Sequence, residues 1–310
     1  MDQFERLTAA LRSRCPELEM REQEPMTCHT TFRIGGPVRL MALPRTEEEA
    51  QLTLRTAREL EVEPFFLGNG SNLLVADEGY PGFVVKLAGA LEEIQVRPPE
   101  RPGLIGRLEA GGALLLSRLS RAALEHGLTG LEFAQGIPGS VGGAVTMNAG
   151  AYGGEIAQVL FQVVALERDG TKRVISGSDC DFGYRHSRFS EGDLLISRAV
   201  FALPEGDREE ISARMEDFAQ RRREKQPLEY PSAGSMFKRP KGHFAAALIE
   251  QCGLKGLSVG GAQVSEKHAG FVVNRGGATC ADVLALVERV KERVLQQTGV
   301  ELEMEVRVLR

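Results

Sequence analysis

Two glycine-rich segments constrain the fold of this chain more than any other feature. Glycine makes up 35 of 310 residues, or about 11%, against a usual share of about 7%. One cluster is Gly68-Asn69-Gly70-Ser71-Asn72, and the other runs from Gly136 to Gly154. Within 136–150 almost no side chain is larger than Val, so the backbone there can approach a ligand closely. A plain tight turn in the first cluster and a close backbone crossing in the second are the alternatives.

The first cluster is not the loop of a Rossmann dinucleotide site. Such a loop must open a helix, whose N-terminus receives the pyrophosphate. Here a strand-like apolar run follows, and Leu73 stands where the third glycine would fall. A glycine-rich turn can still bind phosphate through successive backbone N–H groups, with Ser71 and Asn72 adding side-chain bonds. Together the two clusters predict a large anionic dinucleotide held between two units of the chain.

Charge and cysteine content exclude several classes of protein. The net charge of −5 argues against binding to nucleic acid or to an anionic membrane, which needs basic surface. The first residues lack the apolar segment of a signal peptide, and no apolar run is long enough to span a membrane. Five scattered cysteines without a CxxC pair are typical of reduced thiols and not of a disulfide framework or zinc site. We therefore expect a cytoplasmic protein without a metal.

Hydrophobic periodicity predicts an α+β fold in three units, at 1–80, 81–204 and 205–310. A helix is expected to open at Thr46, with Glu49 completing a capping box, and another at Thr279 with Asp282. Further helices are expected near 4–11, 113–126, 211–218 and 243–252. Strands are expected near 38–43, 64–67, 73–76, 83–87, 104–110, 159–167, 172–175, 194–203, 270–273 and 300–308.

Six short blocks, spread in order over nearly the whole chain, carry a resemblance to one family. The chain resembles the UDP-N-acetylenolpyruvoylglucosamine reductases, the flavoenzymes that complete UDP-N-acetylmuramate for the bacterial cell wall. Each block alone is weak, but their combination is specific. The blocks are Thr30 to Gly36, Gly68 to Leu74, Gly136 to Gly154, Tyr184 to Ser187, Gly234 to Lys238 and Leu302 to Arg307.

The resemblance implies an FAD-binding fold of the vanillyl-alcohol-oxidase type, also called PCMH-type. Two subdomains, 1–80 and 81–204, would hold FAD, and a C-terminal α+β domain, 205–310, would bind substrate, with its last strand able to return to the first subdomain. Neither glycine cluster carries the His or Cys of covalent flavoproteins, so FAD should be noncovalent. The implied cofactor-binding residues are Arg33, Gly68, Asn69, Gly70, Ser71, Asn72, Leu73, Ile137, Gly139, Ser140, Gly142, Gly143, Thr146 and Asn148.

Arg185 is implied to be catalytic, with Tyr184 beside the substrate. A planar guanidinium suits a carboxylate or enolate oxygen bidentately. Taken alone, such an arginine is more often part of a surface ion pair. Lys225 follows the basic run at 221–223 and matches a substrate-binding lysine of the family, although a solvated helix end explains a basic run equally well. The chain resembles the shorter class of the family, which lacks an inserted loop bearing a substrate-capping Tyr.

Ser235 and Glu305 are the other implied catalytic residues. A serine in a Gly-bearing loop is usually a turn residue, but Ser235 aligns with the family's proton donor, and Lys238 is an implied substrate contact. Period-two alternation places Glu305 on a strand face with Glu303 and Arg307. That face could simply be solvated, but the resemblance makes Glu305 the catalytic glutamate.

The implied reaction is NADPH-dependent reduction of UDP-N-acetylglucosamine enolpyruvate. The flavin N5 would deliver hydride to the enolpyruvyl carbon, Arg185 and Glu305 would stabilise the enolate, and Ser235 would supply the proton. Glu305 helps only if it carries a proton, because a carboxylate would repel the developing charge. The partner is then a nucleotide sugar, and we expect a monomer. The alternatives are a sugar or lactone oxidase of the same fold, and a nucleotide-sugar binding protein without redox chemistry.

Overall fold

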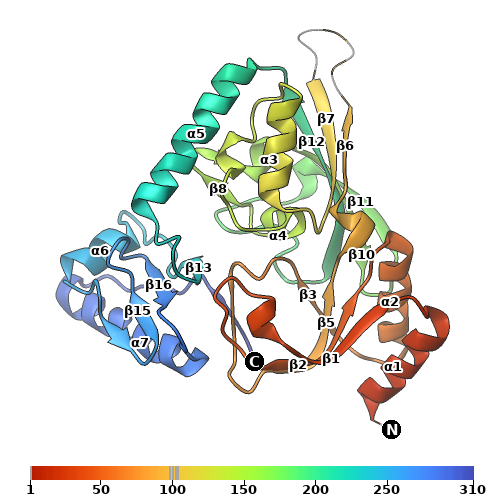
Figure 1. Cartoon of the computed structure of the whole chain (residues 1–310), viewed down its shortest axis with the longest axis horizontal. Coiled ribbons are helices and arrows are strands. Elements are labelled where there is room, and N and C mark those ends of the chain that lie inside the picture. Colours follow the sequence, from red (N-terminus) through yellow and green to blue (C-terminus); the bar gives the residue numbers. More distant parts are fainter. Residues whose placement is uncertain (1, 98, 100, 102–104) are drawn as a thin grey trace. The chain divides into compact units, whose positions relative to one another are not determined.

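The computed structural model describes residues 2–97, 99, 101 and 105–310 (Figure 1). The chain divides into two compact units, each made of three separate stretches. Unit 1 comprises 1–22, 40–69 and 82–220, and unit 2 comprises 23–39, 70–81 and 221–310. The three-domain division at 80 and 204 stays a prediction.

The described residues contain seven α-helices and five 3₁₀ turns, which are interspersed with the strands. The α-helices are α1 (Gln3–Arg14), α2 (Glu47–Glu59), α3 (Leu116–Glu125), α4 (Val141–Thr146), α5 (Arg208–Lys225), α6 (Ala245–Gln251) and α7 (Cys280–Thr298). The 3₁₀ turns are η1 (Met26–Cys28), η2 (Gly89–Glu92), η3 (Glu132–Ala134), η4 (Ile156–Gln158) and η5 (Gly177–Asp179).

The strands are mostly short and antiparallel. They are β1 (Glu19–Pro25), β2 (Pro37–Leu43), β3 (Pro64–Leu67), β4 (Leu73–Val75), β5 (Tyr80–Lys86), β6 (Ile94–Arg97), β7 (Ile105–Gly111), β8 (Gly150–Ala151), β9 (Gly154–Glu155), β10 (Leu160–Glu167), β11 (Lys172–Ser176), β12 (Leu194–Pro204), β13 (Ser232–Ser235), β14 (Ser258–Val259), β15 (Ala262–Val264), β16 (Phe271–Asn274) and β17 (Arg307–Leu309). The predicted strand start at Leu104 lies outside the described residues.

The first layer of unit 1 combines α1 and α2 with a four-stranded sheet in the order β1-β2-β5-β3. The two helices lie side by side (Figure 1), and Leu7 and Leu54 are fully buried in the core that they share. Thr46 caps α2 by accepting a bond from the Glu49 amide, but the Glu49 carboxylate accepts from the amide of Arg45. The predicted capping box is therefore only half formed.

A five-stranded antiparallel sheet, β11-β10-β12-β7-β6, forms the second layer of unit 1. The strands predicted near 159–167 and 172–175 are confirmed as β10 and β11, which pair as an antiparallel hairpin with Gly170 in its turn at φ +81. Helices α3 and α4 pack on this sheet through a core that includes Leu119, Val145 and Phe201. The short helix α4 arises inside the glycine-rich segment, where the sequence analysis expected only loop.

Unit 2 packs α6 and α7 on the sheet β13-β16-β15-β14 (Figure 1). The predicted capping box of α7 is confirmed, because Thr279 accepts from the Asp282 amide and Asp282 accepts from the Thr279 amide. The unit is completed by a parallel pair of strands, in which β17 lies beside β4 and Arg307 pairs with Leu73.

The prediction of one continuous strand over 300–308 is wrong. Only β17 forms a ladder, and the preceding segment makes a single bridge between Met304 and Phe237. The expected alternation holds up to Val306, because Leu302 and Val306 are buried whereas Glu301 and Glu303 are exposed. Alternating hydrophobicity reports which side chains are buried in an extended segment, and it does not require a neighbouring ladder.

Candidate functional site

Unit 1 brings the first glycine cluster against the second. The side-chain amide of Asn69 donates to the carbonyl of Pro138 at 2.6 Å. A Cβ added to Gly68 would lie 2.7 Å from the hydroxyl oxygen of Ser140. The sequence analysis expected these clusters to act together, and residues 68–69 and 138–143 do lie together within one unit.

Ser140 begins α4 and organises the second cluster. Its hydroxyl accepts from the amide of Gly143 at 3.3 Å. The amides of Val141 and Gly142 donate to the carbonyls of Leu114 and Gly112, both at 2.8 Å. These two amides are therefore engaged within the fold. Close packing accounts for a glycine at position 142, because an added Cβ would lie 3.1 Å from the Gly112 carbonyl oxygen.

Gly68 and Gly143 fit a backbone cradle for a phosphate-bearing cofactor. A Cβ added to Gly143 would have only the Ser140 hydroxyl within 4 Å, at 3.4 Å. A side chain at Gly68 would thus crowd this hydroxyl, whereas a Cβ at Gly143 would make an ordinary contact with it. Glycine at both positions keeps that hydroxyl and the neighbouring backbone open. This is the arrangement through which a dinucleotide such as FAD can approach a polypeptide closely.

The other cofactor candidates of this segment have partners inside unit 1. Gly139 accepts from the amide of Leu116 at 2.9 Å, and the half-buried Ile137 donates its amide to Ala134. The hydroxyl of Thr146 donates to the Gly142 carbonyl at 2.9 Å. Asn148 is only 3% exposed.

Arg185 lies at the tip of a tight turn in unit 1. Gly183 and His186 pair across the turn, leaving Tyr184 and Arg185 at its tip. Arg185 has φ +54, a conformation that is uncommon for a residue with a side chain. Both terminal nitrogens of its guanidinium lie 3.5 Å from the carbonyl oxygen of Gly150, and Tyr184 is 58% exposed. Strained backbone of this kind is frequent at functional sites.

The remaining part of the first cluster belongs to unit 2. Gly70 has φ +61, and a Cβ there would lie 2.1 Å from the His29 carbonyl oxygen. Its own carbonyl accepts from the amide of Thr31 at 3.3 Å. Leu73 is buried in β4, half-buried Ser71 precedes it, and Arg33 is exposed with φ +54. The strand after the loop confirms that this is not a Rossmann site.

Ser235 is presented by a β-bulge in unit 2. Ser232 pairs with Val273 and Ser235 with Phe271, so two residues oppose one between these pairs. Gly234 occupies the bulge with φ +78 and has no atom within 4 Å of an added Cβ. Bulges of this type redirect the side chains beside them and are over-represented next to active sites. The Ser235 side chain is exposed.

The segment that carries Glu305 runs beside the one that follows Ser235. The amide of Glu305 donates to the Met236 carbonyl, and the amide of Lys238 donates to the Glu303 carbonyl, both at 2.8 Å. The side chain of Asn72 donates to the carbonyl of Glu305 at 3.3 Å. Unit 2 thus brings together Asn72, Ser235 and Glu305, which lie far apart in sequence.

The predicted basic residues differ in their surroundings. Lys238 forms an ion pair with Glu303, a pairing that the sequence analysis did not predict. Lys225 is exposed at the last position of α5. Within the described residues, no group of three or more His, Cys, Asp or Glu side chains could hold a metal ion. No helix of the described chain is both long and apolar enough to cross a membrane.

Burial shifts the pKa of two cysteine thiols and of one histidine. Burial raises the pKa of the Cys180 thiol to about 11 and that of the Cys280 thiol to about 11. Burial lowers the pKa of His268. All five cysteine thiols are free.

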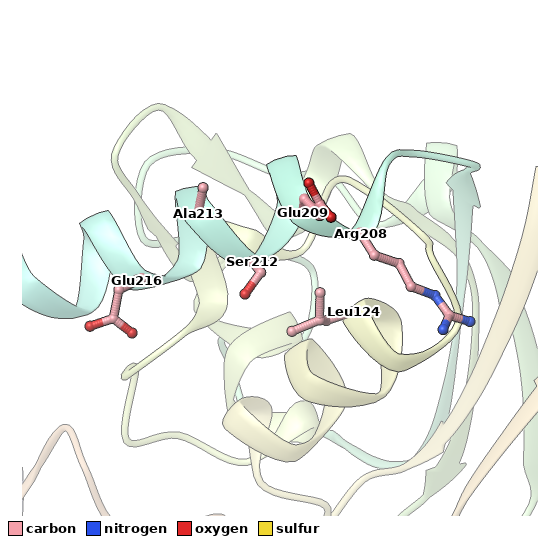
Figure 2. A pocket seen from close by; sticks show the side chains of 6 residues that line it. All are labelled: Leu124, Arg208, Glu209, Ser212, Ala213 and Glu216. Carbon is pink, nitrogen blue, oxygen red and sulfur yellow. The ribbon is translucent and has the colours of Figure 1, made fainter.

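A surface pocket of about 580 Å³ lies between α3 and α5 in unit 1 (Figure 2). In Figure 2, Leu124 of α3 points toward the face of α5 that carries Ser212. None of the residues that line this pocket belongs to the predicted site, so we do not assign the cofactor to the pocket. The lining residues are Leu124, Arg208, Glu209, Ser212, Ala213 and Glu216.

Comparison with known proteins first shows the class of protein to which this chain belongs. A family model described as an FAD binding domain matches residues 38–176, a range that holds both glycine clusters. A solved structure of 4-ethylphenol oxidase from Gulosibacter chungangensis superposes with a TM-score of 0.50 at 13% identity, over 97% of this chain and 65% of that one. That likeness shows the fold alone. The chain is thus an FAD-binding protein of the PCMH-type fold.

More specific matches identify the family. A model for the C-terminal domain of UDP-N-acetylenolpyruvoylglucosamine reductase matches residues 226–309. A curated protein of that name from Syntrophomonas wolfei is 47% identical, with 95% of this chain and 96% of the relative covered. A crystal structure of such a reductase from Thermus caldophilus gives a TM-score of 0.80 at 38% identity, covering 95% and 99% of the two chains. The chain belongs to the UDP-N-acetylenolpyruvoylglucosamine reductase family.

Sequence reasoning missed the residues that hold the site in place. The hydroxyl of Thr31 donates to the carbonyl of Ser232, at the start of β13, at 2.7 Å. The buried Asn274 donates to the carbonyl of Phe32. The Thr30 to Gly36 block is one of the six motifs of the family. Its sequence pattern does not indicate that it is hydrogen-bonded to the strand that carries Ser235.

Proposed function

We propose that this protein reduces UDP-N-acetylglucosamine enolpyruvate to UDP-N-acetylmuramate, with NADPH as the reductant and FAD as the bound cofactor. The observation that carries the proposal is the pairing of the Glu305 segment with the segment after Ser235 in unit 2. It places the two implied catalytic residues on neighbouring stretches of backbone, in a chain that belongs to the reductase family.

FAD, when bound, supplies hydride chemistry, by which hydride received from NADPH adds to the terminal enolpyruvyl carbon. Negative charge then develops on the adjacent carbon and its carboxylate. Arg185 would bind that carboxylate through its guanidinium, since two parallel N–H groups match two oxygens. A protonated Glu305 would donate a hydrogen bond to the enolate oxygen, which strengthens as the charge develops.

Ser235 would complete the reaction by giving its hydroxyl proton to the carbon next to the carboxylate. One hydride and one proton would then be added across the double bond, and solvent would return a proton to the serine oxygen. Because the bulge at Gly234 sets the direction of Ser235, the proton donor is fixed by backbone geometry. A positioned general acid typically contributes about 10²- to 10⁴-fold to a rate.

The nucleotide part of the substrate needs cationic partners. We assign Lys225 and Lys238 to the substrate, together with Tyr184. Lys238 would have to share its ammonium between the substrate and Glu303, with which it forms an ion pair. Residues 68–73 and 137–146, with Arg33, would hold FAD, and Gly68 and Gly143 would let it approach the backbone closely.

We further propose a monomer in a reducing compartment, the cytoplasm, where the product serves peptidoglycan synthesis. Five free thiols support a reducing compartment. Sedimentation of the purified protein, with and without substrate, tests the monomer.

Visible absorption of the purified protein tests the activity directly. Flavin bands that bleach with NADPH in the absence of oxygen and return with the enolpyruvyl substrate would establish both half-reactions. Bands that return only with oxygen would favour a sugar or lactone oxidase. A protein that takes up no flavin even after reconstitution would contradict the proposal.

A further inference from the structure

We propose that Asn148 is a positioning residue for Arg185 and makes no contact with the cofactor. This inference rests on the proposed function, because that function gives Arg185 its role. It separates Asn148 from the cofactor-binding residues among which the family resemblance placed it.

Both polar atoms of the Asn148 side chain are hydrogen-bonded inside unit 1. Its amide nitrogen donates to the Gly183 carbonyl at 3.1 Å, and its amide oxygen accepts from the Ala157 amide at 3.0 Å. The residue is 3% exposed. Because the amide is buried and satisfied from both sides by backbone, it offers no surface from which to bind a dinucleotide.

Gly183 is the residue from which the Tyr184–Arg185 turn starts. Its carbonyl accepts both from Asn148 and from the amide of His186, the bond that closes the turn. Asn148 therefore holds the first residue of the turn that carries Arg185. The next residue but one after Asn148 is Gly150, whose carbonyl lies 3.5 Å from the Arg185 guanidinium.

A second bond holds the other side of the same turn. The hydroxyl of Ser187 donates to the Thr146 carbonyl at 2.7 Å, and Ser187 is fully buried. Both flanks of the turn are thus tied to residues 146–148, at the C-terminal end of α4. A residue such as Arg185, held at positive φ, keeps that conformation only where its surroundings impose it.

The test is a double-substitution cycle built on Asn148→Asp. This change keeps the acceptor for Ala157 but replaces the donor to Gly183 with an oxygen. We expect FAD affinity and the rate of flavin reduction by NADPH to stay within twofold of the unsubstituted protein. Reoxidation by the enolpyruvyl substrate should slow at least tenfold. In an Arg185→Ala background, Asn148→Asp should change reoxidation by less than twofold, since the group on which it acts is gone.

Asn69→Asp is the matched control. Asn69 likewise donates its side-chain amide to a backbone carbonyl, that of Pro138, but it lies in the first glycine cluster and not at the turn. We expect it to weaken FAD affinity. Equal losses of FAD affinity for Asn148→Asp and Asn69→Asp would overturn the proposal, as would an Asn148→Asp effect of the same size with and without Arg185.

Ser187→Ala keeps the proposal testable if Asn148→Asp does not fold. It removes the second tie and leaves Asn148 intact, and it should slow reoxidation with FAD affinity unchanged. Unaltered reoxidation in this variant would contradict positioning of the turn by residues 146–148. Failure of the unsubstituted protein to be reoxidised by the substrate would instead contradict the proposed function, so the two failures are distinguishable.

Discussion

The amide of Glu305 donates to the carbonyl of Met236 at 2.8 Å, one residue after Ser235. Together with the bond from the Lys238 amide to the Glu303 carbonyl, it joins the segment of Glu305 to the residues that directly follow β13. Ser235 directly follows the bulged residue Gly234, and Glu305 is bonded through its own backbone, so both residues are held by backbone contacts. The predictions below separate what each residue contributes.

Replacing Ser235 with alanine should block proton delivery and little else. We expect FAD binding and flavin reduction by NADPH to persist, while reoxidation by the enolpyruvyl substrate falls by about 10²- to 10⁴-fold. Stopped-flow absorbance of the two half-reactions measures this. Ser258→Ala is the control, because the Ser258 hydroxyl donates to the Gly256 carbonyl and accepts from the Gln263 side chain, both close to it in sequence. Collapse of flavin reduction in Ser235→Ala would show that Ser235 has a different role.

Replacing Glu305 with glutamine should remove one limb of the pH–rate profile for reoxidation. The neutral acid donates a hydrogen bond to the enolate and its anion repels the enolate, so the rate should fall at high pH, where the carboxylate is the anion. Glutamine stays neutral and keeps an N–H donor, so its profile should lack this fall. Identical profiles for the two proteins would count against a protonated Glu305.

Replacing Gly234 with alanine should disturb Ser235 through the backbone alone. No atom lies within 4 Å of the added Cβ, but positive φ costs a residue with a side chain about 1–2 kcal/mol. We expect a lower melting temperature and slower reoxidation. Gly234→Asn should be milder in both, because asparagine tolerates this conformation better. Equal behaviour of the two variants would mean that the conformation at this position is unimportant.

His268 should make the protein less stable in mild acid. Burial lowers its pKa in the folded protein, so below about pH 6.5 the unfolded chain takes up the proton first and unfolding is favoured. His268→Gln should therefore lose less melting temperature between pH 7.5 and pH 5 than the unsubstituted protein. A larger loss of melting temperature in His268→Gln would show that His268 does not destabilise the protein in mild acid.

Thiol reagents should discriminate among the five cysteines. Cys28 is exposed, whereas burial raises the pKa of Cys180 to about 11. Since the thiolate is the reactive form, alkylation at pH 8 followed by mass spectrometry should label Cys28 well before Cys180. Labelling of Cys180 first would show that its surroundings open readily.

The sequence predicted the elements with strong periodicity and clear caps. The helix beginning after Thr279 and the hairpin around Gly170 both follow from local rules. Helix α4 was missed because glycine disfavours helices. Ser140 followed by buried Val141, Ala144 and Val145 was a signal for it, since Ser is a strong N-cap residue and these positions share one helix face.

The sequence predicts which residues form the candidate site, but it does not predict the hydrogen bonds that hold them in place. Motif resemblance pointed to Arg185, Ser235 and Glu305. The bonds that hold them run between distant segments, as from Thr31 to Ser232, and no local pattern encodes a long-range hydrogen bond. The role of Asn148 could not be inferred for the same reason, since an asparagine in a glycine-rich loop has the same sequence signature whether it binds a ligand or a neighbouring turn.

The parallel pairing of β17 with β4 has a consequence for synthesis of the protein. Arg307 pairs with Leu73, which is 234 positions earlier in the chain, and Glu305 lies just before that pair. During translation, β4 emerges from the ribosome long before its partner strand exists. Unit 2 therefore cannot assemble Ser235 with Glu305 until residue 309 has emerged, and this half of the candidate site forms only after almost all of the described chain has been made.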